Sequence, residues 1–276
     1  MLHVVATPIG NLADLSRRAV DVLASADLIV AEDTRRCRKL LSHLGLSRRI
    51  VAYHDHSDDA RENELLAALL AGNSLALVAD AGTPLISDPG FRLVRAARAA
   101  GVQVSCVPGP CAAIAALSVA GLPSDRFVFE GFLPARDAAR RARLQELQRE
   151  SRTLIFYESP RRIGATLAAM ETAFGTSRAA VLVRELTKLH ETVLGGSLAV
   201  LRARVDADPE QQLGEIVLLV HGAPPETDDG REQDERALRA LLPRMPLSEA
   251  VECTKEITGS PHNLLYRLAL ELRSEE

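Results

Sequence analysis

The strongest constraint on the fold is a pattern that recurs in the first half of the chain, in which a short apolar segment runs into a loop rich in glycine and proline. Such apolar segments occupy residues 2–6, 75–79 and 102–107, and helix-forming residues follow each loop. Short strands that alternate with helices of about ten residues predict βαβ units and a mainly parallel sheet. Ligands bind at the carboxyl ends of the strands in such sheets. The sequence therefore predicts that these loops line one shared crevice.

The βα pattern resumes after residue 122, where Leu-Pro-Ser-Asp-Arg is typical of a connection between domains. Ser159 followed by Pro160 predicts a helix start, because serine caps helices and proline is favoured at their first position. A stretch rich in proline, glycine and acidic residues then precedes a tail with helical patterns. We expect α/β domains at residues 1–121 and 122–223, a linker at 224–233, and a helical, helix-turn-helix-like tail at 234–276. Further strands are predicted at residues 127–130, 153–157, 179–184, 191–194 and 214–221.

Composition and charge narrow the class of protein and its compartment. The net charge of −4 lacks the overall basic character of proteins that coat nucleic acid, and 47% hydrophobic residues are ample for packed cores. The first residues lack the basic segment of a signal peptide, and the most apolar predicted helix, residues 111–122, is too short to span a bilayer. We expect a soluble cytoplasmic protein. No Cys-x-x-Cys pair occurs, so free thiols are expected at Cys37, Cys106, Cys111 and Cys253.

Charged residues follow predicted strands at several points. Glu32 and Asp33 start a predicted helix, where a carboxylate can act as a base or, as is favoured for Asp33, cap the helix. Residues 35–49 hold six arginine or lysine residues and no acid, so this run either tracks phosphates or forms a solvated helix face. Glu158 and Lys188 each lie in a charged segment that follows a later predicted strand. A lysine beside a carboxylate can act as a base or orient a hydroxyl group, and the alternative is a set of surface ion pairs.

Several common motifs are missing from the sequence. There is no dinucleotide-binding glycine motif, no phosphate-binding P-loop and no Gly-x-Ser-x-Gly nucleophile elbow. One group of possible metal ligands matches no metal-site spacing, so no metal is expected. Its members are His54, Asp55, His56, Asp58 and Asp59.

A set of ordered segments, spread over nearly the whole chain, resembles the tetrapyrrole methylase superfamily. Its members bind S-adenosylmethionine between two α/β domains. The superfamily's third loop usually carries Gly-Asp-Pro, whereas Gly82-Thr83-Pro84 stands here, which indicates a subfamily. The segments start at Ala6, Ala31, Asp80, Val107, Tyr157 and Arg184, and read ATPIGNL, AEDTR, DAGTPLISDPG, VPGP, YESP and RELTK.

Within this superfamily the segments resemble a subfamily that acts on ribosomal RNA. The resemblance implies a homodimer that methylates, without a metal, the ribose 2′-oxygen of a cytidine in the decoding region of 16S rRNA of the small ribosomal subunit. It implies help with proton removal from Lys188, Glu158 or Glu32, and RNA contacts from Arg35, Arg36, Arg38, Lys39 and Arg161. It places S-adenosylmethionine between the two α/β domains, against Pro8, Gly10, Asp80, Gly82, Thr83, Ser87, Asp88, Pro108, Gly109, Ala112, Tyr157 and Glu215.

Two other functions stay open at this point. A methylase of a small macrocycle, such as a tetrapyrrole, would use the same cofactor site but would need neither the basic run nor the helical tail. A non-catalytic RNA-binding or assembly factor that kept the fold would not bind S-adenosylmethionine.

The chain departs from the superfamily at Cys111, where a small hydroxyl residue or alanine is expected, and at Pro261-His262-Asn263, where relatives are more basic.

Overall fold

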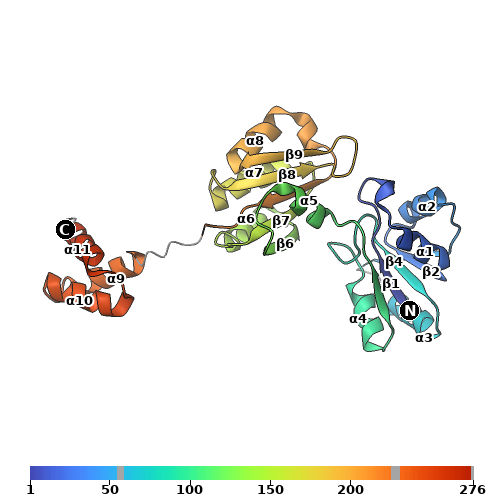
Figure 1. Ribbon diagram of the computed structural model, residues 1–276, viewed down its shortest axis with the longest axis horizontal. Coiled ribbons are helices and arrows are strands. Elements are labelled where there is room, and N and C mark those ends of the chain that lie inside the picture. Colours follow the sequence, from blue (N-terminus) through green and yellow to red (C-terminus); the bar gives the residue numbers. More distant parts are fainter. Residues whose placement is uncertain (55–58, 225–230, 275–276) are drawn as a thin grey trace. The chain divides into compact units, whose positions relative to one another are not determined.

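A computed structural model describes residues 1–54, 59–224 and 231–274 of the chain (Figure 1). The described residues fall into two compact units, Met1–Gly222 and Ala223–Glu276. The larger unit contains β-sheets covered by helices, and the smaller unit is helical. Residues 225–230 of the predicted linker lie outside the described residues, as do Asp55, His56 and Asp58 of the metal ligands considered above.

The first sheet consists of parallel strands in the order β3-β2-β4-β1-β5. Helices α1 (Arg17–Ser25) and α2 (Thr34–His43) pack on one face, and α3 (Asp59–Leu70) and α4 (Phe91–Ala99) pack on the other. Every residue of β4 is buried, because helices cover both faces of a parallel sheet. The predicted parallel βα sheet is confirmed here. Its strands are β1 (Leu2–Val5), β2 (Leu28–Ala31), β3 (Ile50–Ala52), β4 (Leu75–Val78) and β5 (Val104–Val107).

Polar side chains start the first helices where the sequence predicts. Ser16 Oγ accepts a hydrogen bond from Ala19 N at 3.1 Å at the start of α1. Asp33 Oδ1 accepts one from Arg35 N at 2.8 Å at the start of α2. Each bond satisfies a backbone N–H that has no partner within the helix. The interpretation of Asp33 as a helix cap is therefore confirmed.

The second sheet has the order β6-β7-β10-β8-β9 and is mixed. Strands β6 and β7 are parallel, whereas β10 pairs antiparallel with both β7 and β8, and β8 pairs antiparallel with β9. The parallel arrangement of the first sheet therefore does not extend to this half. The connection from β8 to β9 is too short for the crossover that parallel neighbours need. The strands are β6 (Phe127–Phe132), β7 (Thr153–Glu158), β8 (Ala179–Arg184), β9 (Thr192–Ser197) and β10 (Ile216–Val220).

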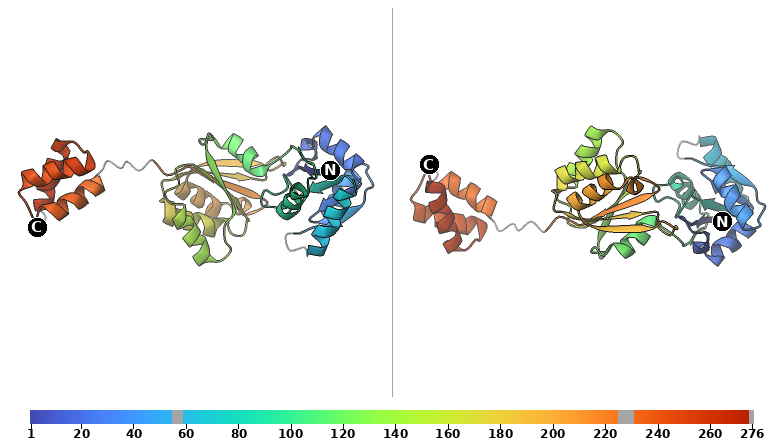
Figure 2. Two further views of the ribbon diagram at one scale, coloured as in Figure 1. Left: turned by 90° about the horizontal axis from the view of Figure 1, so that it is seen from below. Right: turned by 90° about the horizontal axis from the view of Figure 1, so that it is seen from above.

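Helices cover both faces of the second sheet (Figure 2). Helices α6 (Asp137–Glu146), α7 (Ile163–Phe174) and α8 (Leu198–Ala207) pack on one face. Helix α5 (Ala112–Ala120) packs on the other through Ala113, Ala116 and Leu117. The domain boundary predicted after residue 121 groups α5 with the first sheet, whereas its packing places it on the second. The sequence pattern cannot reveal this, because α5 is apolar around most of its circumference.

Helix α7 begins at Ile163 and not at the predicted Ser159-Pro160 start. Residues 159–162 instead form a turn in which Arg162 N donates to Ser159 O at 3.0 Å. Glu158 Oε1 accepts a hydrogen bond from Ser159 N at 2.7 Å. The predicted cap is wrong, because the side chain of Glu158 organises the backbone that follows β7.

The smaller unit packs α9 (Arg231–Leu241), α10 (Leu247–Thr258) and α11 (His262–Ser274) around a core that includes Leu238, Val251 and Leu265. Helix α9 begins inside the predicted linker. Helix α10 ends at Gly259, whose φ of +75° is a left-handed conformation that favours glycine. The predicted glycine stop before α11 is confirmed. Within the described ranges, no helix is both long and apolar enough to cross a membrane.

Candidate functional site

The glycine- and proline-rich loops meet at the carboxyl edge of the first sheet, where β4, β1 and β5 are neighbours. Thr7 and Gly82 exchange backbone hydrogen bonds of 2.9 and 3.0 Å, which join the loop after β1 to the loop after β4. Thr83 Oγ1 donates to Pro110 O at 2.9 Å and so joins the loop after β4 to the loop after β5. The prediction that these loops come together is confirmed.

The loop after β4 adopts an unusual backbone conformation. Leu85 and Ser87 have φ values of +73° and +61°, which residues with side chains rarely adopt. Ser87 also reaches the second sheet, since a Cβ atom added at Gly131 of β6 would lie 2.7 Å from Ser87 Oγ. Backbone strain of this kind persists where surrounding contacts impose it, as at ligand clamps. The loop therefore has a defined shape and connects the two sheets.

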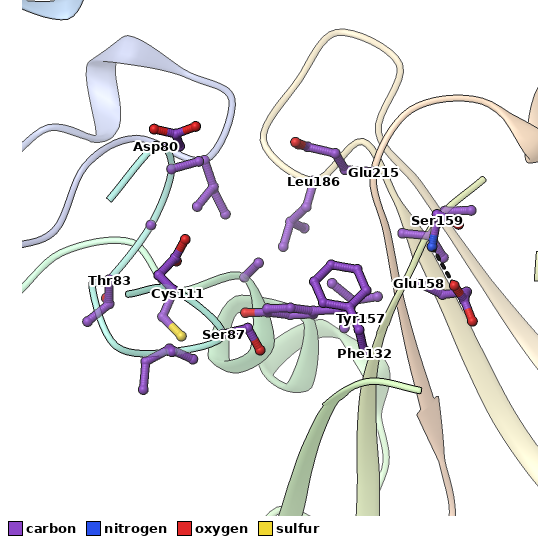
Figure 3. Close-up of a pocket in the computed structure, with 18 of the residues that line it drawn as sticks. Asp80, Thr83, Ser87, Cys111, Phe132, Tyr157, Glu158, Ser159, Leu186 and Glu215 are labelled. Carbon is purple, nitrogen blue, oxygen red and sulfur yellow. Dashed lines mark hydrogen bonds between the residues drawn. The ribbon is translucent and has the colours of Figure 1, made fainter. Parts of the chain in front are cut away.

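A pocket of about 430 Å³ lies between these loops and the ends of β7 and β10 (Figure 3). Its volume falls within the range of pockets that hold cofactors. Glu32, Arg36 and Glu158 also line it. Most residues of the predicted cofactor site line this pocket, namely Asp80, Gly82, Thr83, Ser87, Asp88, Ala112, Tyr157 and Glu215.

The remaining predicted cofactor residues do not line the pocket but shape the loops around it. Pro8 and Gly10 belong to the loop after β1, and Pro108 and Gly109 to the loop after β5. A Cβ atom added at Gly109 would lie 3.0 Å from the Cβ of Ala6, so glycine allows the two loops to pack closely. These residues act on the pocket through the backbone.

Phe132 and several aliphatic side chains also line the pocket and were missed by the sequence interpretation. Phe132 ends β6, two residues beyond the strand predicted at 127–130. The register of β6 shifts between Phe129 and Gly131, which is a β-bulge, and bulges redirect side chains near sites. The aromatic pattern of the strand was the available signal, but the bulge hides which face Phe132 takes.

Carboxylates supply much of the polar lining of the pocket. Asp80 Oδ1 accepts a hydrogen bond from Asp33 N at 2.9 Å, and its Oδ2 lies 3.4 Å from Arg36 Nη1. These partners fix Asp80 at the end of β4. A lining of this kind favours a ligand that carries positive charge or donates hydrogen bonds. The carboxylates in the lining belong to Glu32, Asp80, Asp88, Glu158 and Glu215.

Tyr157 joins the pocket to α5. Its hydroxyl oxygen accepts a hydrogen bond from Ala113 N at 3.1 Å. Burial is the main cause that raises the pKa of Tyr157, so the phenol stays protonated at neutral pH. The ring centroids of Phe129 and Phe132 lie 5.0 and 5.6 Å from that of Tyr157, in the edge-on arrangement that aromatic pairs favour. The rings of Phe132 and Tyr157 form an apolar part of the pocket lining beside the carboxylates, and Phe129 packs on Tyr157.

Lys188 lies in the loop after β8, beside the pocket and not in its lining. Its Nζ donates to Glu185 Oε1 at 2.7 Å and to Glu215 Oε2 at 2.9 Å. The pKa of Lys188 is raised overall: burial by itself would lower it, but the carboxylates of Glu185 and Glu215 outweigh that effect. Burial raises the pKa of Glu185, but hydrogen bonds from Lys188 and from Glu215 N outweigh burial and lower it. Lys188 is therefore an ammonium ion at neutral pH and suits orienting a hydroxyl group better than deprotonating it.

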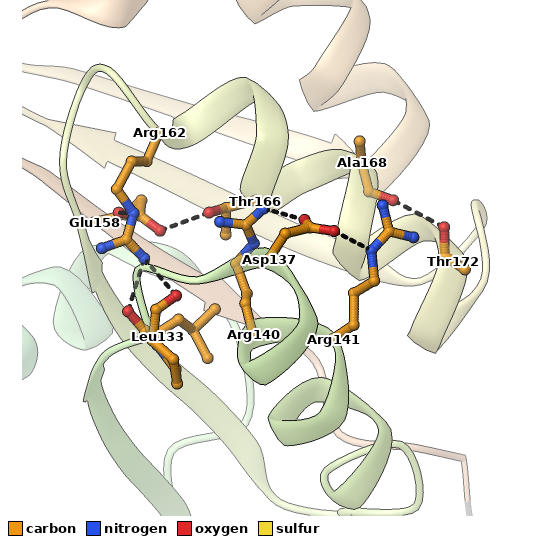
Figure 4. A network of polar contacts seen from close by, with 10 residues as sticks. Leu133, Asp137, Arg140, Arg141, Glu158, Arg162, Thr166, Ala168 and Thr172 are labelled. Atoms are coloured by element: carbon orange, nitrogen blue, oxygen red, sulfur yellow. Dashed lines mark hydrogen bonds and ion pairs between the residues drawn. The ribbon is translucent and has the colours of Figure 1, made fainter.

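Glu158 borders the pocket, but its carboxylate is buried and bound on both oxygens (Figure 4). Oε1 lies 3.2 Å from Arg162 Nε, in addition to its bond from Ser159 N, and Oε2 accepts a hydrogen bond from Thr166 Oγ1 at 2.6 Å. Arg162 Nη2 in turn donates to Leu133 O at 2.7 Å. Glu158 is thus suited to holding the loops around the pocket, and not to accepting a proton from a ligand.

The predicted RNA-contacting residues lie on α2 and on the turn after β7. Arg35 Nη2 lies 3.1 Å from Asp33 Oδ2. The hydrogen bond from the Arg35 side chain is the main cause that lowers the pKa of Asp33 to about 2. Arg36 is the member of this set that lines the pocket. The exposed basic residues are Arg35, Arg36, Arg38, Lys39 and Arg161.

Possible metal ligands do not cluster in the part of the chain that the structure describes. No group of three or more His, Cys, Asp or Glu side chains is arranged to hold a metal within residues 1–54, 59–224 and 231–274. Cys37, Cys106, Cys111 and Cys253 are free thiols. Of these thiols, that of Cys111 lines the pocket.

Known protein families match most of the chain. Residues 1–201 match the family described as tetrapyrrole (corrin/porphyrin) methylases, and residues 228–273 match the RsmI C-terminal HTH domain. A protein of Xylella fastidiosa (strain Temecula1 / ATCC 700964), named ribosomal RNA small subunit methyltransferase I, is 54% identical over 266 residues, which cover 96% of this chain and 97% of that protein. A protein of the same name from Escherichia coli O157:H7 is 49% identical over 270 residues, which cover 98% of this chain and 94% of that protein.

Solved structures share the fold at low sequence identity. The methyltransferase CobJ aligns with a TM-score of 0.59 and 20% identity over 80% of this chain and 94% of its own. Diphthine synthase aligns with a TM-score of 0.59 and 14% identity over 97% of this chain and 99% of its own. The predicted α/β fold is therefore confirmed. The helical tail that follows it matches a separate family, the RsmI C-terminal HTH domain.

Proposed function

Because this chain belongs to the tetrapyrrole methylase family, we propose that it methylates the ribose 2′-oxygen of a cytidine in the decoding region of 16S rRNA. The methyl donor is S-adenosylmethionine. The observation that carries the proposal is the similarity to relatives named ribosomal RNA small subunit methyltransferase I, which are 46% to 54% identical over 96% to 99% of this chain. That similarity includes both sheets, the pocket and the tail, which supports a common substrate as well as a common reaction.

The pocket fits S-adenosylmethionine in size and in chemistry. The bound cofactor supplies an electrophilic methyl group on a positively charged sulfur, beside an ammonium group, hydroxyl groups and a base with flat aromatic faces. The carboxylates of Asp80, Asp88 and Glu215 suit the positive charge and the donors, and Ile86 and Leu186 suit the base. The defined shape of the loop after β4 supports this assignment, because a site that is already formed lowers the entropy cost of binding.

Proton removal is the chemical step that this chain must assist, because a ribose hydroxyl is a poor nucleophile while it keeps its proton. Glu32 lines the pocket, and its carboxylate would accept that proton. Lys188, held by Glu185 and Glu215, would orient the hydroxyl oxygen and stabilise its developing negative charge. Glu158 would position the turn after β7. Correct placement of the hydroxyl against the methyl group would supply much of the remaining rate.

The basic face of α2 supports RNA as the substrate. Arg35, Arg36, Arg38 and Lys39 would contact phosphates next to the pocket, together with Arg161 across it. A small macrocycle would not require this face. The substrate would be the small ribosomal subunit, which places the reaction in the cytoplasm.

We also propose that the chain acts as a homodimer. Helix α5 exposes Ile114 and Val119, whose exposed fractions are 50% and 47%, on the side opposite its packed face. Burial of such side chains against a second copy would stabilise a dimer. Sedimentation equilibrium of the wild type and of Ile114→Glu tests this point, and a monomeric wild type would refute it.

The experiment that tests the function is methyl transfer to small ribosomal subunits purified from cells that lack the modification. The full chain is incubated with labelled S-adenosylmethionine, and the labelled position is then mapped by nuclease digestion and mass spectrometry. The label is expected on the 2′-oxygen of one cytidine in the decoding region. Label elsewhere in 16S rRNA would correct the target. No label in rRNA, with cofactor binding intact by calorimetry, would refute the proposed substrate.

A further inference from the structure

Phe132 is an exposed aromatic residue at the edge of the pocket. Its side chain lines the pocket, yet 57% of the residue is accessible to solvent. Its ring lies edge-on to Tyr157, which is itself more deeply placed (Figure 3). The ring therefore presents an apolar surface at the rim of the pocket that a second ligand, next to the cofactor, can contact.

The backbone that carries Phe132 is held in place by the partly buried ion pair of Arg162 and Glu158. Arg162 Nη2 donates to Leu133 O at 2.7 Å and to Pro134 O at 3.3 Å, the two carbonyl groups that follow Phe132. Arg162 is oriented by Glu158, whose side chain is fully buried. The β-bulge at Gly131 sets the direction of the residue from the other side. The ring is thus pre-positioned, although it is exposed.

The 2′-oxygen must come within reach of a methyl group that is held in the pocket, and a nucleotide that enters a pocket gives up stacking with its neighbours. Its base then needs a new apolar surface, and aromatic side chains supply one in proteins that recognise single-stranded RNA. We propose that Phe132 is the stacking surface for the base of the target nucleotide, an inference that rests on the proposed function. Phe132 would thereby determine substrate binding, while its exposed place at the rim of the pocket would give it only a minor share in holding the cofactor.

The test compares Phe132→Ala, Phe132→Leu and Phe132→Tyr with the wild type. Phe127→Ala is the matched control, because Phe127 is an exposed phenylalanine at the other end of β6 that does not line the pocket. The readouts are the affinity for unmodified small subunits by filter binding, the affinity for S-adenosylmethionine by calorimetry, and single-turnover methyl transfer. Melting temperature confirms that each variant folds.

Loss of one stacked base is expected to weaken subunit affinity about tenfold or more for Phe132→Ala, and about as much for Phe132→Leu. Phe132→Tyr retains the ring and is expected to keep wild-type affinity, as is Phe127→Ala. S-adenosylmethionine is expected to bind all variants equally. Equal subunit affinity of all variants would overturn the inference. A loss of cofactor affinity in Phe132→Ala, without a loss of subunit affinity, would overturn it as well and would make Phe132 a wall of the cofactor site.

The same experiment separates this inference from the proposed function. The proposed function is refuted if the wild type binds subunits but places no methyl group on the ribose. In that case the subunit affinities of the variants, relative to the wild type, still test the stacking. The stacking inference is refuted, with the function intact, when the wild type methylates the cytidine and Phe132→Ala binds subunits and methylates them at the wild-type rate.

Discussion

Gly10 lies directly against the side chain of Lys188: a Cβ atom added at Gly10 would lie 2.5 Å from Lys188 Cγ. The loop after β1 and the loop after β8 are therefore in van der Waals contact, although they belong to different sheets. The same added atom would lie 3.0 Å from Thr187 Oγ1, and Thr187 has a φ of +67°. The contact with Gly10 thus helps to set the position of the ammonium group that we assign to the hydroxyl oxygen of the substrate.

Gly10→Ala is expected to displace Lys188 and to slow methyl transfer about tenfold, because an added methyl group at a close contact costs about 1–3 kcal/mol or moves its neighbour. Single-turnover rates and melting temperatures are the measurements. Gly195→Ala is the matched control, since an added Cβ atom there meets nothing within 4 Å. A wild-type rate for Gly10→Ala would show that the contact does not position Lys188.

Lys188→Met is expected to reduce single-turnover methyl transfer about 10²-fold, the usual cost of removing one group that stabilises developing negative charge. S-adenosylmethionine affinity is expected to change little, because Lys188 does not line the pocket. Lys255→Met, which removes a more exposed lysine from the helical tail, controls for the loss of charge. An unchanged rate in Lys188→Met would remove this residue from the mechanism.

The ion pair between Lys188 and Glu185 gives a specific pH dependence of stability. The pKa of Glu185 is lowered from 4.5, so its contribution is present above pH 4.5 and is lost as the pH falls through the folded-state value. The pKa of Lys188 is raised from 10.5, so its contribution is present below pH 10.5 and is lost as the pH rises through the folded-state value. The difference in melting temperature between wild type and Lys188→Met is therefore expected to be flat between these limits and to shrink outside them. A difference that changes steadily across neutral pH would contradict the assigned protonation states.

Glu158→Gln is expected to destabilise the protein by about 3 kcal/mol, because it leaves the buried side of Arg162 without its charged partner. At a temperature where the variant is folded, methyl transfer is expected to stay within about tenfold of the wild type, whereas loss of a general base costs about 10²–10⁴-fold. Denaturant unfolding and single-turnover kinetics measure the two effects. Glu146→Gln, at an exposed pair with Arg143, is the control and is expected to cost under about 1 kcal/mol. A large rate loss in folded Glu158→Gln would restore Glu158 as a catalytic base.

The part of the site that could be predicted from sequence is the part that depends on local signals. Glycine and proline after β1, β4 and β5 mark the loops, and parallel strands bring their carboxyl ends to one edge. Asp33 caps α2 because its side chain bonds a backbone N–H two residues away. Both features act over a few residues, so the pattern along the chain is sufficient to predict them.

The part that could not be predicted depends on contacts between distant segments. Glu158 resembles a charged residue at a strand end, and its burial follows from Arg162 and Thr166 on the next turn and helix. Phe132 lies beyond the predicted strand, and a bulge decides its direction. Neither the depth of a carboxylate nor the face of a bulged residue can be derived from periodicity.

The sequence by itself determined the parallel first sheet, the loops at its carboxyl edge and the stop between the last helices, because hydrophobic periodicity, caps and glycine act locally. Only the tertiary structure decided the chemistry of the charged residues. Strand β10 lies antiparallel between β7 and β8, and this arrangement brings Glu215 to Lys188, which is 27 residues away in the sequence. The carboxylate then keeps that lysine in place as an ammonium ion. Electrostatic environment depends on distance in space, which the order of residues does not state.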